Sequence, residues 1–184
     1  AKGFECIYNM HWKKLYGICF FQTQKEELAK VTNLEGRKGK LSDALKGADV
    51  FIGVSQPGVV SPADIKSMNK DPIVFALANP DPEILPGEIK GIARIIATGR
   101  SDYANQVNNV LCFPGIFKGA MECRAREITA NMKIAAAYAI AETVKAEELR
   151  EDYIIPGIFK VDVAAKVAQR VKEAAIKDGV ARIS

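Results

Sequence analysis

The sequence predicts an α/β fold of three layers, α/β/α, built on a mostly parallel sheet. Three observations support this prediction. From Glu26 onward, short runs rich in β-branched and aromatic residues alternate with stretches of helical character, which is the pattern of parallel α/β proteins. These runs end abruptly at Gly, Pro or Asn. The chain has 184 residues, 48% of them apolar, and this length suits one domain.

Three strands are expected. The first, over 48–54, is a compact apolar run of the kind that is buried on both faces of a sheet. The second, over 72–78, stops at Asn79-Pro80, because proline cannot donate to a sheet ladder and keeps the preceding residue out of the helical region. The third, over 93–98, runs into a polar loop. Ligands of parallel sheets bind beyond the carboxyl ends of the strands, so we expect the site in the loops that follow them.

Two short helices are expected between the strands. Ser42 has the side chain of a helix N-cap and precedes a helix over 43–46. Ser61 followed by Pro62 predicts a second helix that runs to about Asn69, because serine caps a helix and proline is favoured at its first position.

Three longer helices are expected over about 114–127, 129–144 and 162–177. In the last two, apolar side chains recur at helical spacing and predict one buried face each. These faces consist of Met132, Ala136, Ala139, Ile140 and Val144 in one helix, and of Val163, Val167, Val171 and Ala174 in the other.

Composition argues against several classes of function. The formal charge of +4 is spread along the chain, without the basic block of a nucleic-acid footprint. No apolar run approaches the roughly 18–20 residues that span a bilayer, and no signal sequence stands at the N-terminus. We therefore expect a cytoplasmic protein that contacts neither nucleic acid nor membrane.

The cysteines and the single histidine predict neither a metal centre nor a catalytic triad. Cys6, His11 and Cys19 can be drawn around a zinc ion, but their spacing matches no trusted metal signature, and reduced thiols are the favoured interpretation. His11 lies outside any motif and no GxSxG occurs, so a histidine-based nucleophilic triad has little support.

Two of the loops after strands combine small residues with hydrogen-bonding groups. The first, 54–61, carries Ser55, Gln56 and Pro57, and its small residues would let the backbone approach a ribose or pyrophosphate closely. The second presents Asn79, whose amide can hold a carboxylate or hydroxyl without adding charge. In both loops an ordinary turn remains the alternative.

The loop after the third strand is the richest in amides, with Asn105, Gln106, Asn108 and Asn109. This neutral surface suits a carboxamide together with an α-hydroxy acid, and a polar surface loop is the alternative. Asn109 immediately precedes an apolar run and should point into the crevice, whereas Asn105 should face solvent. Amides orient ligands but accept no protons at neutral pH, so these loops predict recognition rather than acid–base catalysis.

Three segments resemble malic enzymes of prokaryotic type. They are Gly-Val-Ser at 53–55 with Pro57-Gly58, Phe-Ala-Leu-Ala-Asn-Pro at 75–80, and Asn-Gln-Val-Asn-Asn-Val at 105–110 through Phe-Pro-Gly at 113–115. Residues 25–53 and the helix around 133–142 are also similar to the family. The resemblance implies a partial Rossmann-like domain and the oxidative decarboxylation of malate to pyruvate and CO2. It further implies NAD or NADP, a divalent cation (Mn or Mg), and a homo-oligomer, a dimer in the full-length enzyme.

The resemblance also implies roles for single residues. Asn79 and Asn109 would contact the substrate, with Asn108 as a register alternative, and Asn109 would also lie near the nicotinamide. Ser55, Gln56 and Pro57 would line the dinucleotide. The resemblance leaves the choice between NAD and NADP open.

The first part of the chain departs from the family pattern. The family's proton-transferring tyrosine and lysine and its metal-binding carboxylates belong to sequence that precedes the part seen here, so we expect no catalytic residue and no metal ligand in this chain, and no activity from it alone. No G-x-G-x-x-G occurs, and 1–24 is a divergent segment, which predicts a truncated domain whose distal part is 25–184. A non-catalytic nucleotide-binding or assembly module and another Rossmann dehydrogenase remain as alternatives.

Overall fold

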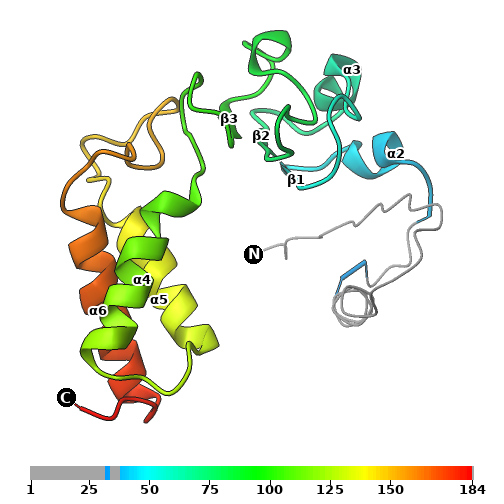
Figure 1. Cartoon of the computed structure of the whole chain (residues 1–184). Helices are drawn as coiled ribbons and strands as arrows, with labels where there is room; N and C mark the ends of the chain where they lie inside the picture. Colours follow the sequence, from blue (N-terminus) through cyan, green and yellow to red (C-terminus); the bar gives the residue numbers. More distant parts are fainter. Residues whose placement is uncertain (1–31, 34–37, 184) are drawn as a thin grey trace.

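The computed structural model describes residues 32–33 and 38–183, which form a small parallel sheet with short helices and a bundle of three longer helices (Figure 1). The sheet and the bundle lie at opposite ends of the described chain, joined by the segment that leaves the last strand. The fold is α/β and partial Rossmann-like, as expected. No helix in these two stretches has the length and apolar character to cross a membrane.

The sheet has three parallel strands in the order β1 (Val50–Gly53), β2 (Ile73–Ala76), β3 (Ile95–Thr98). Each strand is shorter than the apolar run from which it was predicted. The strands begin opposite one another, with Val50 opposite Ile73 and Ile73 opposite Ile95. This arrangement brings the carboxyl ends of all three strands to one edge.

The expected burial of the first strand on both faces is wrong. Phe51 and Gly53 are buried, but Ile52, which points to the opposite face, is 64% exposed. The reason is tertiary: the core packs on the face to which Phe51 points, and the face to which Ile52 points is left exposed. Successive side chains of a strand point to opposite faces, and only one face of β1 meets the core. That core includes Ile65, Val74 and Ile84.

The first short helix, α2 (Leu41–Leu45), begins two residues earlier than expected. Lys40 rather than Ser42 is its N-cap, because the Asp43 carboxylate accepts the backbone N–H of Lys40 at 2.8 Å and Ser42 lies within the first turn. Gly47, with φ of 74°, ends this segment in a conformation that glycine adopts without strain.

The second short helix, α3 (Pro62–Lys66), confirms the capping prediction at its start. The Ser61 hydroxyl accepts the N–H of Asp64 at 3.3 Å, and the Asp64 carboxylate accepts the N–H of Ser61 at 2.8 Å. The helix ends at Lys66, earlier than the expected Asn69. A one-turn 3-10 helix, η1 (Pro86–Glu88), lies between β2 and β3.

The bundle consists of α4 (Phe113–Glu122), α5 (Ala130–Ala141) and α6 (Val163–Lys177). Both α4 and α5 pack mainly on α6. The predicted inward positions Met132, Ala136 and Ala139 of α5 and Val163, Val167 and Val171 of α6 are buried. Ile140, Val144 and Ala174 are only half-buried, and Ala175 instead is fully buried.

The first two helices of the bundle end sooner than expected. The α4 helix stops at Glu122, because Cys123 caps it and Arg124 takes a φ of 48°, which breaks the helical path. The α5 helix starts at the expected cap, where the Thr129 hydroxyl accepts the N–H of Met132 at 3.2 Å, and ends at Ala141.

Two glycines allow α4 to approach α6 closely. Gly115 and Gly119 are four residues apart and therefore lie on one face of α4. A Cβ at Gly115 would lie 2.5 Å from the Cβ of Val167, and one at Gly119 would overlap the carbonyl oxygen of Ala168. The backbones of the two helices thus meet with no room for a side chain between them.

Candidate functional site

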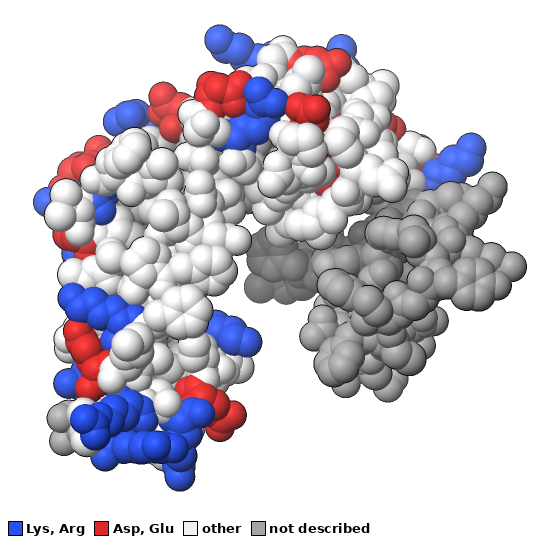
Figure 2. All heavy atoms as spheres, in the orientation of Figure 1, with Lys and Arg blue, Asp and Glu red and all other residues white. Residues whose placement is uncertain are grey.

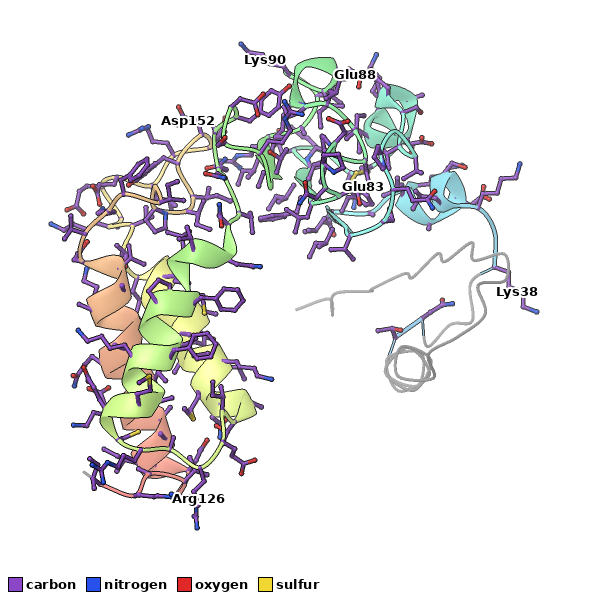
Figure 3. All side chains as sticks on the ribbon, viewed as in Figure 1. Lys38, Glu83, Glu88, Lys90, Arg126 and Asp152 are labelled. Carbon is purple, nitrogen blue, oxygen red and sulfur yellow. The ribbon has the colours of Figure 1, made fainter. Side chains whose placement is uncertain are left out.

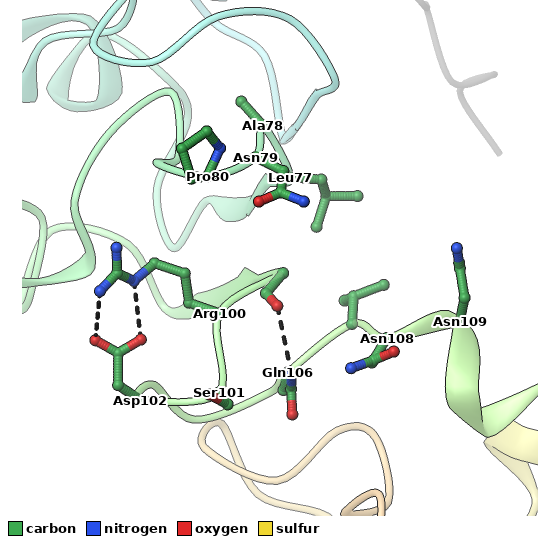
Figure 4. A pocket seen from close by; sticks show the side chains of 12 residues that line it. Leu77, Ala78, Asn79, Pro80, Arg100, Ser101, Asp102, Gln106, Asn108 and Asn109 are labelled. Carbon is green, nitrogen blue, oxygen red and sulfur yellow. Dashed lines mark hydrogen bonds and ion pairs between the residues drawn. The ribbon is translucent and has the colours of Figure 1, made fainter.

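The loops that follow β2 and β3 face each other across a cavity of about 550 Å³ at the carboxyl edge of the sheet (Figure 4). This is the position at which parallel sheets bind their ligands. The lining consists of Leu77, Ala78, Asn79 and Pro80 from one loop, and of Gly99, Arg100, Ser101, Asp102, Gln106, Val107, Asn108 and Asn109 from the other.

Asn79 stands in the loop that follows the second strand, three residues beyond the strand's last residue, Ala76. It follows Ala78 directly, its side chain is exposed, and it borders the cavity. The peptide bond between Asn79 and Pro80 is cis. The strand ends earlier than expected, at Ala76, and its last ladder bond comes from the N–H of Leu77.

Asn108 and Asn109 lie on the opposite wall from Asn79 (Figure 4). The side-chain oxygen of Asn108 accepts the N–H of Val110 at 3.0 Å and caps a one-turn 3-10 helix, η2 (Asn109–Leu111). Its amide nitrogen is the group left to donate to a ligand. Asn109 is exposed at the first position of η2. The structure therefore brings Asn79, Asn108 and Asn109 around one cavity.

Asn105 does not face solvent, which corrects the expectation. It is only 6% exposed and holds a φ of 54°. Its amide nitrogen donates to the carbonyl oxygens of Ile96, at 3.0 Å, and Glu151, at 2.8 Å, while its side-chain oxygen accepts the N–H of Ile154 at 2.9 Å. Both the nitrogen and the oxygen of this side-chain amide thus form hydrogen bonds within the protein. Asn105 connects β3 to the segment that precedes α6, and it is structural.

The loop with Ser55, Gln56 and Pro57 is exposed and does not line this cavity. Both the N–H and the hydroxyl of Ser55 donate to one oxygen of Glu83, at 2.7 and 3.1 Å. This loop is therefore attached to the segment that follows β2, and its contact with a dinucleotide stays a prediction.

Glu83 was not selected by sequence reasoning, although it closes the Asn79 loop. It is 0% exposed, and its second carboxylate oxygen accepts the N–H of Ala78 at 3.0 Å. Figure 3 shows Glu83 among the elements of the sheet, whereas Lys90 and Glu88 lie at the outside of the same part of the molecule. The feature of the sequence that could have identified Glu83 is an acidic residue directly before the apolar Ile84, in the segment that follows the second strand.

Gly53 makes the burial of Glu83 possible. A Cβ at this position would lie 2.5 Å from Cδ of Glu83 and 2.8 Å from the ring of Phe51. The absence of a side chain at the end of β1 thus creates the space that the carboxylate occupies.

Arg100 ties the two walls of the cavity together. Its guanidinium binds both carboxylate oxygens of Asp102, at 2.8 and 2.9 Å (Figure 4), and it also binds one oxygen of Asp81 at 2.8 Å. The hydrogen bond from Arg100 lowers the pKa of Asp102, and the same bond raises the pKa of Arg100. Two carboxylates thus already surround this cation, whereas the Asn79 and Asn109 side chains that line the cavity are exposed.

The described residues contain no group of three or more His, Cys, Asp or Glu side chains that is suited to hold a metal ion. The candidate set Cys6, His11 and Cys19 lies outside the described residues. Cys112 and Cys123, which lie within them, are free thiols, and burial raises the pKa of Cys112.

Comparison with known protein families identifies the family to which this chain belongs. Residues 19–176 match the model of the malic enzyme NAD binding domain, which is most of the chain. The chain belongs to the malic enzyme family. The α/β fold, the Asn-Pro turn and the amide loop are therefore parts of a malic enzyme domain.

Individual malic enzymes are closely similar over this stretch. The chain is 59% identical to the NAD-dependent malic enzyme of Geobacillus stearothermophilus over 157 residues, which cover 85% of the chain and 33% of the relative. It is 45% identical to the NADP-dependent malic enzyme of Escherichia coli, covering 78% of the chain and 21% of the relative. The crystal structure of malic enzyme from Pyrococcus horikoshii Ot3 superposes with a TM-score of 0.79 at 54% identity, over 83% of this chain and 36% of that one. The chain thus spans about a third or less of these malic enzymes.

Proposed function

We propose that this chain supplies the nicotinamide-side cofactor contacts and the malate contacts of a malic enzyme, which converts malate to pyruvate and CO2 with NAD or NADP. The convergence of Asn79, Asn108 and Asn109 on one cavity at the carboxyl edge of a parallel sheet is the observation that carries this proposal. Membership of the malic enzyme family supports it. Both NAD- and NADP-dependent enzymes are among the similar proteins, so both cofactors remain in the proposal.

The chemistry of the cavity suits a dicarboxylate with a hydroxyl group. Each carboxamide offers N–H donors to a carboxylate and an oxygen acceptor to a hydroxyl. Asn79 and Asn109 approach from opposite walls, so one small ligand can be held between them. The described residues do not offer a ligand set that fits a divalent cation, and we assign no step to a metal here.

We expect isothermal titration of this chain to show malate binding in the presence of NAD or NADP, and Asn79→Ala and Asn109→Ala each to weaken it. Losing one hydrogen bond to a charged ligand costs about 1.5–3 kcal/mol, or roughly ten- to a hundredfold in Kd. Asn69→Ala is the matched control, because Asn69 is exposed and bonds Asp49 at the other end of the sheet.

The outcome that contradicts the site is an equal loss in all three variants. Absence of binding by the unaltered chain, with folding verified by circular dichroism, would contradict the proposed function itself.

We also propose that the protein acts as a homo-oligomer. Along α4, Phe113 and Phe117 stack with ring centroids 5.9 Å apart and remain half-exposed, and Met121 is 76% exposed. Figure 2 shows uncharged atoms along the upper part of this helix, while charged side chains cover other parts of the visible face. Apolar patches of this kind mark contact surfaces.

We expect sedimentation velocity to show association that Phe117→Glu abolishes, because a carboxylate at the centre of an apolar contact loses its water without gaining a partner. Leu149→Glu is the control, since Leu149 is exposed outside α4. A strictly monomeric chain at all concentrations would overturn this proposal.

A further inference from the structure

Backbone pairing between β1 and β2 ends just short of the candidate site. The last bond runs from the N–H of Leu77 to the carbonyl of Gly53, at 3.0 Å. Beyond it the two chains separate into loops, and the next inward N–H groups, those of Ser55 and Ala78, have no strand partner. The carboxylate of Glu83 accepts both N–H groups, that of Ser55 on one oxygen and that of Ala78 on the other. A side chain thus continues the sheet where the backbone can no longer do so.

The main chain of the same segment reinforces this link. The carbonyl oxygen of Glu83 accepts the N–H of Val60 at 3.2 Å, and that of Pro82 accepts the N–H of Gly58 at 3.3 Å. The loop after β1 is therefore attached to the segment after β2 at its start, by the carboxylate, and at its end, by the backbone.

Burying this carboxylate has a free-energy cost, which its partners must offset. Glu83 is completely buried, and within the described part of the chain its oxygens meet N–H and O–H donors rather than a cation. An apolar side chain would fill such a space at lower cost, but it would leave two N–H groups unpaired. What a carboxylate adds is a rigid connection between two loops, with one oxygen for each.

We propose that Glu83 is a positioning residue that sets the loop carrying Ser55 at a fixed separation from the turn carrying Asn79. This inference rests on the proposed function, in which the first loop serves the dinucleotide and the second serves malate. Glu83 touches neither ligand. It acts through Ser55 and through Ala78, the residue directly before Asn79.

The test is Glu83→Gln, which keeps the shape but replaces one acceptor oxygen by an NH2 group that faces an N–H donor. We expect faster amide hydrogen exchange, measured by NMR, at whichever of Ser55 and Ala78 faces the NH2 group, and malate and NAD affinities that each fall by about tenfold or more although Asn79 and Asn109 are intact. Glu88→Gln is the control, because Glu88 is exposed in the same segment and accepts only the N–H of Leu85, at 3.2 Å.

Amide hydrogen exchange tests the link made by Glu83, and ligand binding by the unaltered chain tests the proposed function. Faster exchange at that amide with unchanged affinities means that Glu83 is merely structural and overturns the inference, as does unchanged exchange at both amides. If the unaltered chain binds neither ligand, the proposed function fails, while the exchange data still decide whether the link exists. Should Glu83→Gln not fold, Glu83→Asp retains the charge but is too short to span both loops, and we expect it to protect only one of the two amides.

Discussion

Gly119→Val is expected to lower the free energy of unfolding by about 3 kcal/mol or more. Overpacking a core typically costs about 1–3 kcal/mol, and more where the neighbour cannot move. Here the neighbours are the backbone carbonyl of Ala168 and the Cβ of Val171, at 3.0 Å, both held within α6. Local propensity predicts the opposite sign, since glycine is the worse helix former by a few tenths of a kcal/mol.

Urea denaturation followed by circular dichroism measures this effect. Gly157→Val is the matched control, because a Cβ at Gly157 meets nothing within 4 Å and its φ lies outside the left-handed region. A change within about 0.5 kcal/mol of the unaltered chain at Gly119 would show that the two helices are not in backbone contact.

Asn105→Ala is expected to lower the free energy of unfolding by about 2–4 kcal/mol. The substitution removes three buried hydrogen bonds and leaves the N–H of Ile154 without its partner. An unpaired buried polar group alone costs about 1–3 kcal/mol. Alanine also tolerates the φ of 54° less well than asparagine does.

Asn109→Ala is the natural comparison, because the two residues are the same type in the same loop. Asn109 is exposed, so its replacement should change stability by less than about 0.5 kcal/mol while weakening malate binding. Thermal and urea unfolding of both variants, together with malate titration, check that Asn105→Ala loses stability and that Asn109→Ala keeps its stability but binds malate more weakly. If Asn105→Ala were as stable as Asn109→Ala, the buried position of Asn105 would be wrong.

Local rules were sufficient for much of the fold. The cap formed by Ser61 and Pro62 and the buried face of α6 each depend on residues within a few positions of one another. Prediction was less successful at the ends of several helices, even though the residues that set those ends are close in sequence. Ser42 failed as a cap because Asp43 secures Lys40 instead, and the boundaries of α4 and α5 shifted by several residues.

The candidate site divides in the same way. Its loops were predictable, because the carboxyl ends of parallel strands converge and Asn79, Asn108 and Asn109 follow such ends. The role of each amide within a loop was not. Asn105 finds its partners 46 and 49 residues away, at Glu151 and Ile154, and no pattern around Asn105 indicates them.

The sequence by itself determined the class of fold, the order of strands and helices, the position of the loops that line the cavity and the resemblance to malic enzymes, because periodicity, turn residues and motifs are local properties. Only the tertiary structure decided that Ile52 is exposed on an edge strand and that Glu83 joins two loops. It also decided that Gly119 leaves room for a neighbouring helix. The physical reason is common to all three: burial and hydrogen bonding depend on which segments meet, as Glu83 meets Ser55 from 28 residues away.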